Sequence, residues 1–153
     1  MAELHDLTAL EQAGAVRRRE ISPAELVEHH LARLDRRNDE LGAFVTVTGD
    51  AARQQAEEAE ARVTAEDPAL LPPLFGVPIA IKDLNLTAGV RTTLGSRVYE
   101  QFVPPVDDHV VELLRRAGTI PAATAAPAPP LDPPADRLGS HGVRAGGATT
   151  GSV

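Results

Sequence analysis

The run from Leu74 to Asp83 limits the possible folds of this chain more than any other stretch. It reads Leu-Phe-Gly-Val-Pro-Ile-Ala-Ile-Lys-Asp, and its apolar segment over 79–81 predicts a strand buried in a sheet. Gly76 and Pro78 indicate that the strand starts at an edge or a bend. The strand ends at Lys82, which is the only lysine among the 153 residues.

The position of Lys82 suggests more than a solvated charge. An ammonium group at the end of a buried strand is costly to desolvate, so Lys82 is expected either to pair with an acid or to be neutral. On a strand it shares the face of Ala80, whereas Asp83 takes the other face and is not the obvious partner. Spacing alone leaves four roles open: a structural ion pair, a Schiff base, a phosphate contact, or the base of a serine–lysine hydrolase.

Helices are predicted before and after this strand. At Ser22 the sequence Ser-Pro-Ala-Glu combines an N-cap residue, a proline at the first helical position and Glu25 as the third-position partner of a capping box. The helix that starts there is expected to end near 36–38. Three more helices are predicted from capping residues and periodicity: one capped by Asp6, one that Asp50 caps and that runs to about Ala65, and one over 110–117 that Asp107 or Asp108 caps and Gly118 ends.

Short strands alternate with these helices. The β-branched run over 42–48 predicts one strand, and Thr119-Ile120 resembles the first step of another that is not continued. Residues 121–153 hold six of the 13 prolines and five of the 12 glycines, so they are predicted to be a Pro/Gly/Ala-rich tail that is disordered or encoded in a shifted reading frame. The predicted division is 1–120 as the folded part and 121–153 as the tail.

Composition excludes several classes of function. The formal net charge is −7 and a basic cluster occurs only at 17–19, so no nucleic-acid partner is expected. The chain has no cysteine, which excludes a disulfide framework and a thiolate metal site. An amino terminus without basic and apolar regions, and the lack of an apolar run of roughly 20 residues, favour a cytoplasmic protein without a membrane partner.

The adjacent histidines His29 and His30 raise the question of a metal ion. Neighbouring residues of a helix point about 100° apart, so they cannot readily share one ion. They are interpreted as surface and core-edge histidines, and neither a metal nor a cofactor is expected.

Five blocks of sequence carry a resemblance to a known family. They are Ile21 to Val27, 38–47, Leu74 to Asp83, Gly89 to Ser96, and the helix from Val110 to Gly118. In order and spacing they resemble the N-terminal part of an amidase-signature enzyme, over about residues 4–120. The resemblance implies an incomplete α/β fold, the opening part of a mixed β-sheet covered by α-helices.

The same resemblance implies an activity. Enzymes of this family hydrolyse carboxylic amide C–N bonds with a Ser–cis-Ser–Lys triad, so a small-molecule amide is the expected substrate. The lysine of the block Pro-Ile-Ala-Ile-Lys-Asp is the base in this family, and that role falls on Lys82. Its neutral amine would take a proton from the cis-serine, which relays it from the nucleophilic serine.

The sequence departs from the family at the two serines. In the family they lie in a segment of the form Gly-Gly-Ser-Ser-Gly-Gly-Ser, and the stretch Gly146 to Ser152 has no serine in either matching position. Lys82 is therefore the only catalytic residue assigned, and the isolated chain is expected to be inactive. A frameshift or truncation after Ile120 is one hypothesis, which translation of the downstream DNA in all three frames would test.

Two alternatives to a simple amidase stay open. The same blocks occur in the amidase subunit of a glutamyl-tRNA amidotransferase. The chain could also be a non-catalytic remnant or interaction module in which Lys82 is only structural. The sequence does not indicate the oligomeric state.

Overall fold

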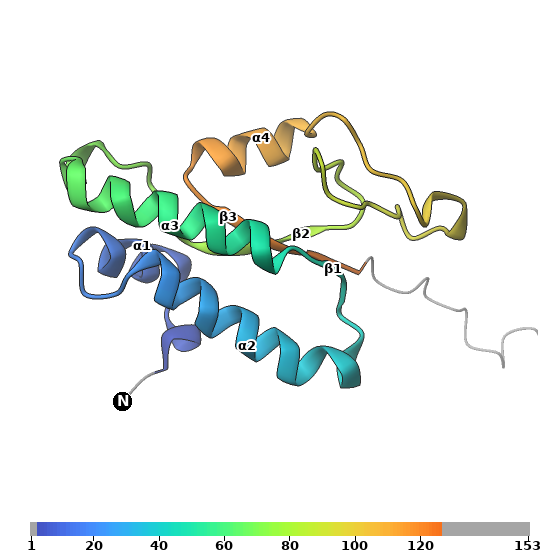
Figure 1. Cartoon of the computed structure of the whole chain (residues 1–153), viewed down its shortest axis with the longest axis horizontal. Coiled ribbons are helices and arrows are strands. Elements are labelled where there is room, and N and C mark those ends of the chain that lie inside the picture. The colour runs from blue at the N-terminus through green and yellow to red at the C-terminus, as the bar shows by residue number, and fades with distance from the viewer. Residues whose placement is uncertain (1–2, 127–153) are drawn as a thin grey trace, which may run out of the picture.

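The computed structural model of this protein describes residues 3–126, which form an α/β structure (Figure 1). The helices and strands follow one another in the order α1 (Ala9–Arg17), α2 (Pro23–Leu41), β1 (Phe44–Val47), α3 (Gly49–Ala65), β2 (Pro78–Lys82), α4 (His109–Arg116) and β3 (Ile120–Ala125). Single turns of 3-10 helix add η1 (Leu4–Asp6), η2 (Pro68–Leu70) and η3 (Arg97–Tyr99). No helix among the described residues is both long and apolar enough to cross a membrane.

A three-stranded mixed sheet lies at the centre of the molecule, with the order β1-β3-β2. β3 pairs antiparallel with β1 and parallel with β2. The parallel pair is connected through α4, as parallel neighbours require a crossover. This arrangement confirms the predicted fold class, a mixed sheet covered by helices.

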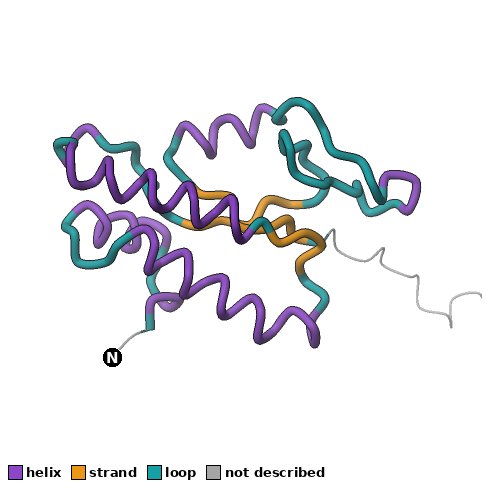
Figure 2. The backbone as a smooth tube through the Cα atoms, in the orientation of Figure 1, coloured by secondary structure: helices purple, strands orange, loops and turns teal. Residues whose placement is uncertain are grey.

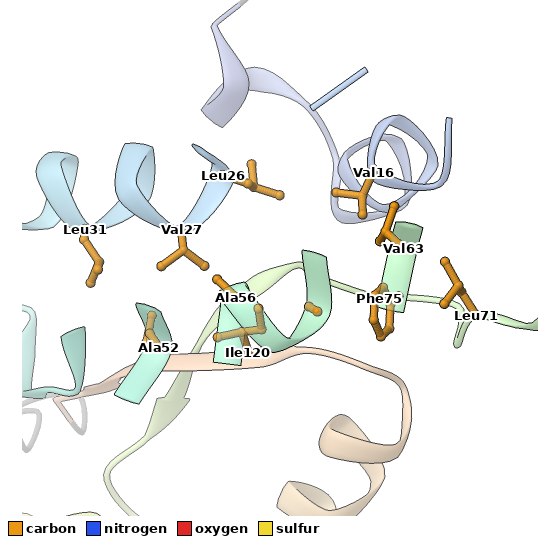
Figure 3. Packing of buried hydrophobic residues seen from close by; sticks show 12 residues of the cluster. Val16, Leu26, Val27, Leu31, Ala52, Ala56, Val63, Leu71, Phe75 and Ile120 are labelled. Carbon is orange, nitrogen blue, oxygen red and sulfur yellow. The ribbon is translucent and has the colours of Figure 1, made fainter. Parts of the chain in front are cut away.

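Helices cover both faces of the sheet (Figures 1 and 2). α2 and α3 lie on one side and α4 lies on the other (Figure 3). A long loop leaves the carboxyl end of β2 and returns to α4 (Figure 2). The end of β2, the candidate site in the sequence, is therefore next to this loop.

The prediction that no strand follows Ile120 is wrong. Residues Ile120–Ala125 form the central strand of the sheet, and Ala122, Ala123 and Thr124 are buried. Small side chains on both faces suit a strand between two layers of helices, and they produce no apolar alternation to detect. Pro121 pairs with Ile79, directly before the irregularity of register between Ile79 and Ala80, where the strand tolerates a residue without an amide hydrogen. The predicted boundary at 120/121 is thus too early, and the rest of the predicted tail, 127–153, lies outside the described residues.

The main hydrophobic core lies between the sheet and helices α1 to α3. α3 contributes a stripe of small side chains, Ala52, Ala56 and Ala59, which recur at helical spacing and allow a close approach to β3. Figure 3 shows Ala52 and Ala56 close to Ile120, with Val27 of α2 facing them. Leu26 and Val27 of α2 are fully buried in the same cluster.

Capping residues place the helices largely as predicted, with corrections for three of them. Asp50 does not cap α3, because the helix already starts at Gly49 and Thr48 is its N-cap residue. The Ser22 side chain accepts a hydrogen bond from the Glu25 amide at 3.0 Å, which confirms the start of α2. The predicted end at 36–38 is one turn too early, because α2 continues to Leu41 and ends at Gly42 with φ of 57°. The first helix starts from Thr8 and not from Asp6, since Thr8 and Glu11 form the capping box there.

Candidate functional site at the carboxyl end of β2

Lys82 lies at the last position of β2, and its side chain is exposed. Ala80 on the same face is also exposed, whereas Ile81 and Asp83 on the opposite face are buried. The predicted alternation of faces is confirmed, but the expectation of a desolvated Lys82 is not met in this structure. The reason is that the face of β2 carrying Ala80 and Lys82 is left open at its carboxyl end.

Lys82 forms no ion pair within residues 3–126. Its backbone carbonyl accepts a hydrogen bond from the Asn85 amide at 2.9 Å, which begins the turn after the strand. In register it lies beside Ala125 of β3. The backbone at this position is thus fixed while the amine remains accessible.

Asp83, the next residue, is the buried charged group of this region. It is fully buried, and its carboxylate accepts hydrogen bonds from the Thr93 amide at 3.0 and 3.1 Å and from the Thr93 hydroxyl. Its own amide donates to the Ala125 carbonyl at 2.8 Å, and its carbonyl accepts from the Leu94 amide at 3.1 Å. Asp83 therefore joins the end of β2 to β3 and to the long loop.

Two further carboxylates hold the start of the same loop. Asp107 accepts a hydrogen bond from the Ala88 amide and Asp108 accepts one from the Leu86 amide, both at 2.7 Å. Asp108 occupies the N-cap position of α4, but its side chain makes no cap hydrogen bond there. Asp108 therefore stands at the predicted N-cap position. The carboxylates of Asp107 and Asp108 accept hydrogen bonds from loop amides and not from the first turn of the helix.

The far part of the loop is tied to β1. The Arg91 guanidinium donates to the Val45 carbonyl at 2.7 Å, and the Thr46 hydroxyl donates to the Arg91 carbonyl at 3.2 Å. Leu94 adopts a φ of 52°, a left-handed conformation that is rare for leucine. The hydrogen bond from its amide to Asp83 holds this residue in place.

The hydroxyl groups of the loop make hydrogen bonds within the loop and to Asp83 at its start. Thr92 donates to the Val90 carbonyl at 3.1 Å, Thr93 donates to Asp83, and Ser96 accepts from the Val98 amide at 3.3 Å. These are the contacts of side chains that stabilise turns, a common use of Thr and Ser in loops.

An open groove of about 270 Å³ lies between α2 and the sheet. Leu31 and Leu34 of α2, Phe44, and Ile79 and Ala80 of β2 contribute to its largely apolar lining. Lys82 is not among the lining residues, but it stands two positions beyond Ala80 on the same strand face. The groove is therefore a neighbour of the candidate site and does not contain it.

Within residues 3–126 the side chains placed to share a metal ion are Glu3, His5 and His29. They lie on the amino-terminal segment and α2, away from the end of β2. Sequence reasoning missed this group because 24 residues separate the two histidines that meet. His29 and His30 are both partly buried, as interpreted from the sequence.

The sequence of this chain is similar to sequences of known proteins. The family model "Amidase" matches residues 25–126. The chain is 49% identical over 102 residues to a glutamyl-tRNA(Gln) amidotransferase subunit of a Synechococcus species, in a match that covers 66% of this chain and 20% of that protein. It is 42% identical over 118 residues to the subunit of the same name from Geobacter sulfurreducens, covering 77% and 24% respectively.

Solved structures agree in fold. A bacterial aryl acylamidase of the amidase signature family superposes with a TM-score of 0.71 at 26% identity, over 78% of this chain and 25% of that one. Fatty acid amide hydrolase superposes with a TM-score of 0.74 at 20% identity, over 80% and 21%, and shows the shared fold alone.

The chain thus spans about a fifth to a quarter of the length of the relatives it matches. The blocks around Ser22, Lys82 and Gly118, which carried the resemblance, fold into α2, β2 and the end of α4. Because the matched model extends over more than half of its residues, this chain belongs to the amidase signature family.

Proposed function

We propose that this chain is the lysine-bearing portion of an enzyme that hydrolyses amide C–N bonds through a Ser–cis-Ser–Lys triad. The observation that carries the proposal is the place of Lys82, an accessible amine at the end of a strand whose next residue, Asp83, is buried and anchored. An ordered backbone with a free amine is what a positioned proton acceptor requires.

In the proposed reaction the neutral Lys82 amine accepts a proton from the cis-serine, which accepts one from the nucleophilic serine. The serine oxygen attacks the amide carbonyl carbon, the C–N bond breaks, and the proton leaves with the amine. Water then cleaves the acyl-enzyme ester and restores the serine. Both serines must come from a serine-rich signature that the 153 residues do not contain, so the isolated chain is expected to have no turnover.

The surface of the chain supports association with the serine-bearing portion. Val106, Val110 and Leu113, on α4 and the segment before it, are 58%, 44% and 48% exposed. Apolar side chains that gather on one surface favour a contact with another protein surface. Since the match covers only 20% and 24% of two such relatives, we propose that the remainder of the amidase domain covers this face and the open end of β2.

The test combines this chain with a polypeptide carrying the serine signature and the remaining sheet of a related amidase. Turnover of an aryl amide should arise only in the mixture. Lys82→Ala should lower it by about 10²–10⁴-fold, the range of a general base. Lys82→Arg is the matched variant, because it keeps the positive charge but cannot act as a base near neutral pH.

The two variants separate catalysis from structure. If Lys82 is the base, Arg fails as completely as Ala. Restoration of turnover by Arg would show that only a cation is needed and would contradict the proposed role. No turnover in any mixture, despite stable association, would favour the alternative that the chain is a non-catalytic remnant or interaction module.

A second candidate is the amidase portion of a glutamyl-tRNA(Gln) amidotransferase. The observation favouring it is the identity of 49% and 42% to two proteins of that name, compared with 26% to the aryl acylamidase. Co-purification with a tRNA-binding partner protein, and glutamine-dependent amidation of glutamyl-tRNA by the assembled complex, would support this candidate. Hydrolysis of simple amides without any response to glutamyl-tRNA would count against it.

A further inference from the structure

We propose that Glu3, His5 and His29 form a binding site for a divalent transition-metal ion of the zinc class, which fastens the amino-terminal segment to α2. The site is independent of Lys82 and of the proposed amide hydrolysis. Two imidazoles and a carboxylate are ligands that Zn²⁺ takes in proteins, with water able to complete a coordination number of four.

The three ligand atoms lie close together. Nδ1 of His5 lies 3.0 Å from Nε2 of His29 and 3.2 Å from Oε2 of Glu3. All three ligand atoms lie within 4.8 Å of one another. With zinc–ligand bonds of roughly 2.0–2.1 Å, two ligands of a tetrahedral ion are about 3.3 Å apart. The observed separations therefore need changes of only a few tenths of an ångström at the two close contacts.

The three groups have too few hydrogen atoms to satisfy one another, which favours a cation between them. A carboxylate has no hydrogen to donate, and the contact between two ring nitrogens can hold one shared proton. His5 Nδ1 faces both Glu3 and His29, so a proton there can satisfy only one neighbour fully. A divalent ion accepts electron pairs from all three atoms at once, which a single proton does not.

The second nitrogen of His5 provides an independent indication. Its Nε2 lies 3.8 Å from a carboxylate oxygen of Asp6. Histidines that bind metal through one ring nitrogen commonly have the other directed toward a carboxylate, which orients the ring and makes it a better ligand. The arrangement Asp6–His5–ion would follow that pattern.

The fold holds the ligands before any ion arrives. The Glu3 amide donates to the Asp6 side chain at 3.0 Å and the Asp6 amide donates to the Glu3 carbonyl at 2.9 Å, closing the turn that carries His5. Gln12 is buried and donates to the Leu4 carbonyl at 3.1 Å, which fixes this turn against α1. The rings of His5 and His29 are nearly parallel, with 5.2 Å between centroids and 19° between planes, and meet through their ring nitrogens. The segments that carry the ligands are thus held in place, and binding requires rotation of the side chains so that they face one ion.

The direct test is calorimetric titration of the tag-free, full chain with ZnCl₂, and with CoCl₂ followed by visible absorption. The background is the His109→Gln/His141→Gln double variant, which removes the histidines outside the amino-terminal region but leaves the proposed site intact. It should bind one Zn²⁺ saturably, and Co²⁺ should give the intense visible bands of a low-coordinate site.

In that background Glu3→Gln, His5→Gln and His29→Gln should each weaken binding by about tenfold or more, since even outer-shell changes cost 10–100-fold. Glu3 is mostly exposed, so its variant should keep the fold, which far-UV circular dichroism would verify. Zn²⁺ should also raise the melting temperature of the background chain and not of the His29→Gln variant. Zn²⁺ affinity unchanged by all three substitutions, or no saturable binding by the background chain, would overturn the proposal.

Discussion

Asp83 accepts hydrogen bonds from both the backbone amide and the hydroxyl of Thr93, and it does so while fully buried beside the exposed Lys82. One strand end thus presents two charged groups with opposite tasks. The carboxylate fixes the loop to the sheet, and the amine remains accessible for the proposed chemistry.

Removing the Asp83 carboxylate should release the loop. Asp83→Ala leaves the Thr93 donors without their partner and opens a buried space, so we expect a loss of about 1–3 kcal/mol in the free energy of unfolding. Thr93→Val should cost a similar amount. Urea unfolding of both single variants and the double variant would measure the coupling between the two residues.

The coupling should be clearly non-zero, because the hydrogen bond from the Thr93 hydroxyl to Asp83 is lost in either single variant, while the bond from the Thr93 amide is lost only in Asp83→Ala. Asp35→Asn on the exposed side of α2 serves as the control and should change stability by less than about 0.5 kcal/mol. Strict additivity of the Asp83 and Thr93 changes would contradict the assigned contact.

Alanine substitutions at Gly118 and Gly89 would separate the effect of a steric clash from that of backbone conformation. Both have positive φ, 88° and 72°, but a Cβ at Gly118 would lie 2.9 Å from the Phe75 Cα whereas one at Gly89 would meet nothing within 4 Å. Gly89→Ala should cost about 1–2 kcal/mol, the strain of a left-handed residue. Gly118→Ala should cost more, because backbone packed against backbone cannot yield cheaply. Thermal melts showing equal losses would be evidence against this close approach.

The Ser22 cap should contribute measurably to stability. Ser22→Ala removes the hydrogen bond to the Glu25 amide and should destabilise the chain by about 1 kcal/mol. Thr64→Ala is the contrasting variant, because Thr64 is an exposed residue within α3 and alanine is the better helix former, so its stability should stay equal or rise slightly. Equal stability of the Ser22 variant and the parent in chemical denaturation would rule out a role for this cap.

His30 should make the fold sensitive to mild acid. Burial, together with the nearby charges of His29, His5 and Arg33, lowers the pKa of His30 from its ordinary value of 6.5. The unfolded chain therefore binds a proton more readily than the folded chain as pH falls through 6.5. Stability is complete above that pH and is lost on going down toward the lowered folded value.

Unfolding free energies between about pH 5 and 7.5, measured with a chelator to keep metal ions away, would report this effect. His30→Gln should flatten the slope over the upper part of that range. A His109→Gln control should retain it, because His109 is exposed at the start of α4. A parent slope of zero just below the ordinary histidine pKa would contradict the prediction.

Several elements could be predicted because their causes are local. Ser22-Pro23 starts a helix through its own hydrogen bond and ring geometry, Gly118 ends one through its left-handed backbone, and the β-branched run near Phe44 favours a strand. The alternation around Lys82 is likewise a property of the strand itself, and it assigned Lys82 and Asp83 to opposite faces correctly.

The features that could not be predicted depend on contacts between residues distant in the chain. β3 is a strand because α3 and the neighbouring strands supply the partners that its small residues, such as Ala122 and Ala123, cannot indicate by pattern. Burial of Asp83 rather than Lys82 follows from where the loop folds back and offers the Thr93 donors. His5 reaches His29 only after the amino-terminal turn has docked on α2. The sequence by itself determined the family, the helix cap at Ser22, the helix end at Gly118 and the candidate base, while tertiary packing decided which charged groups are buried and which are left accessible.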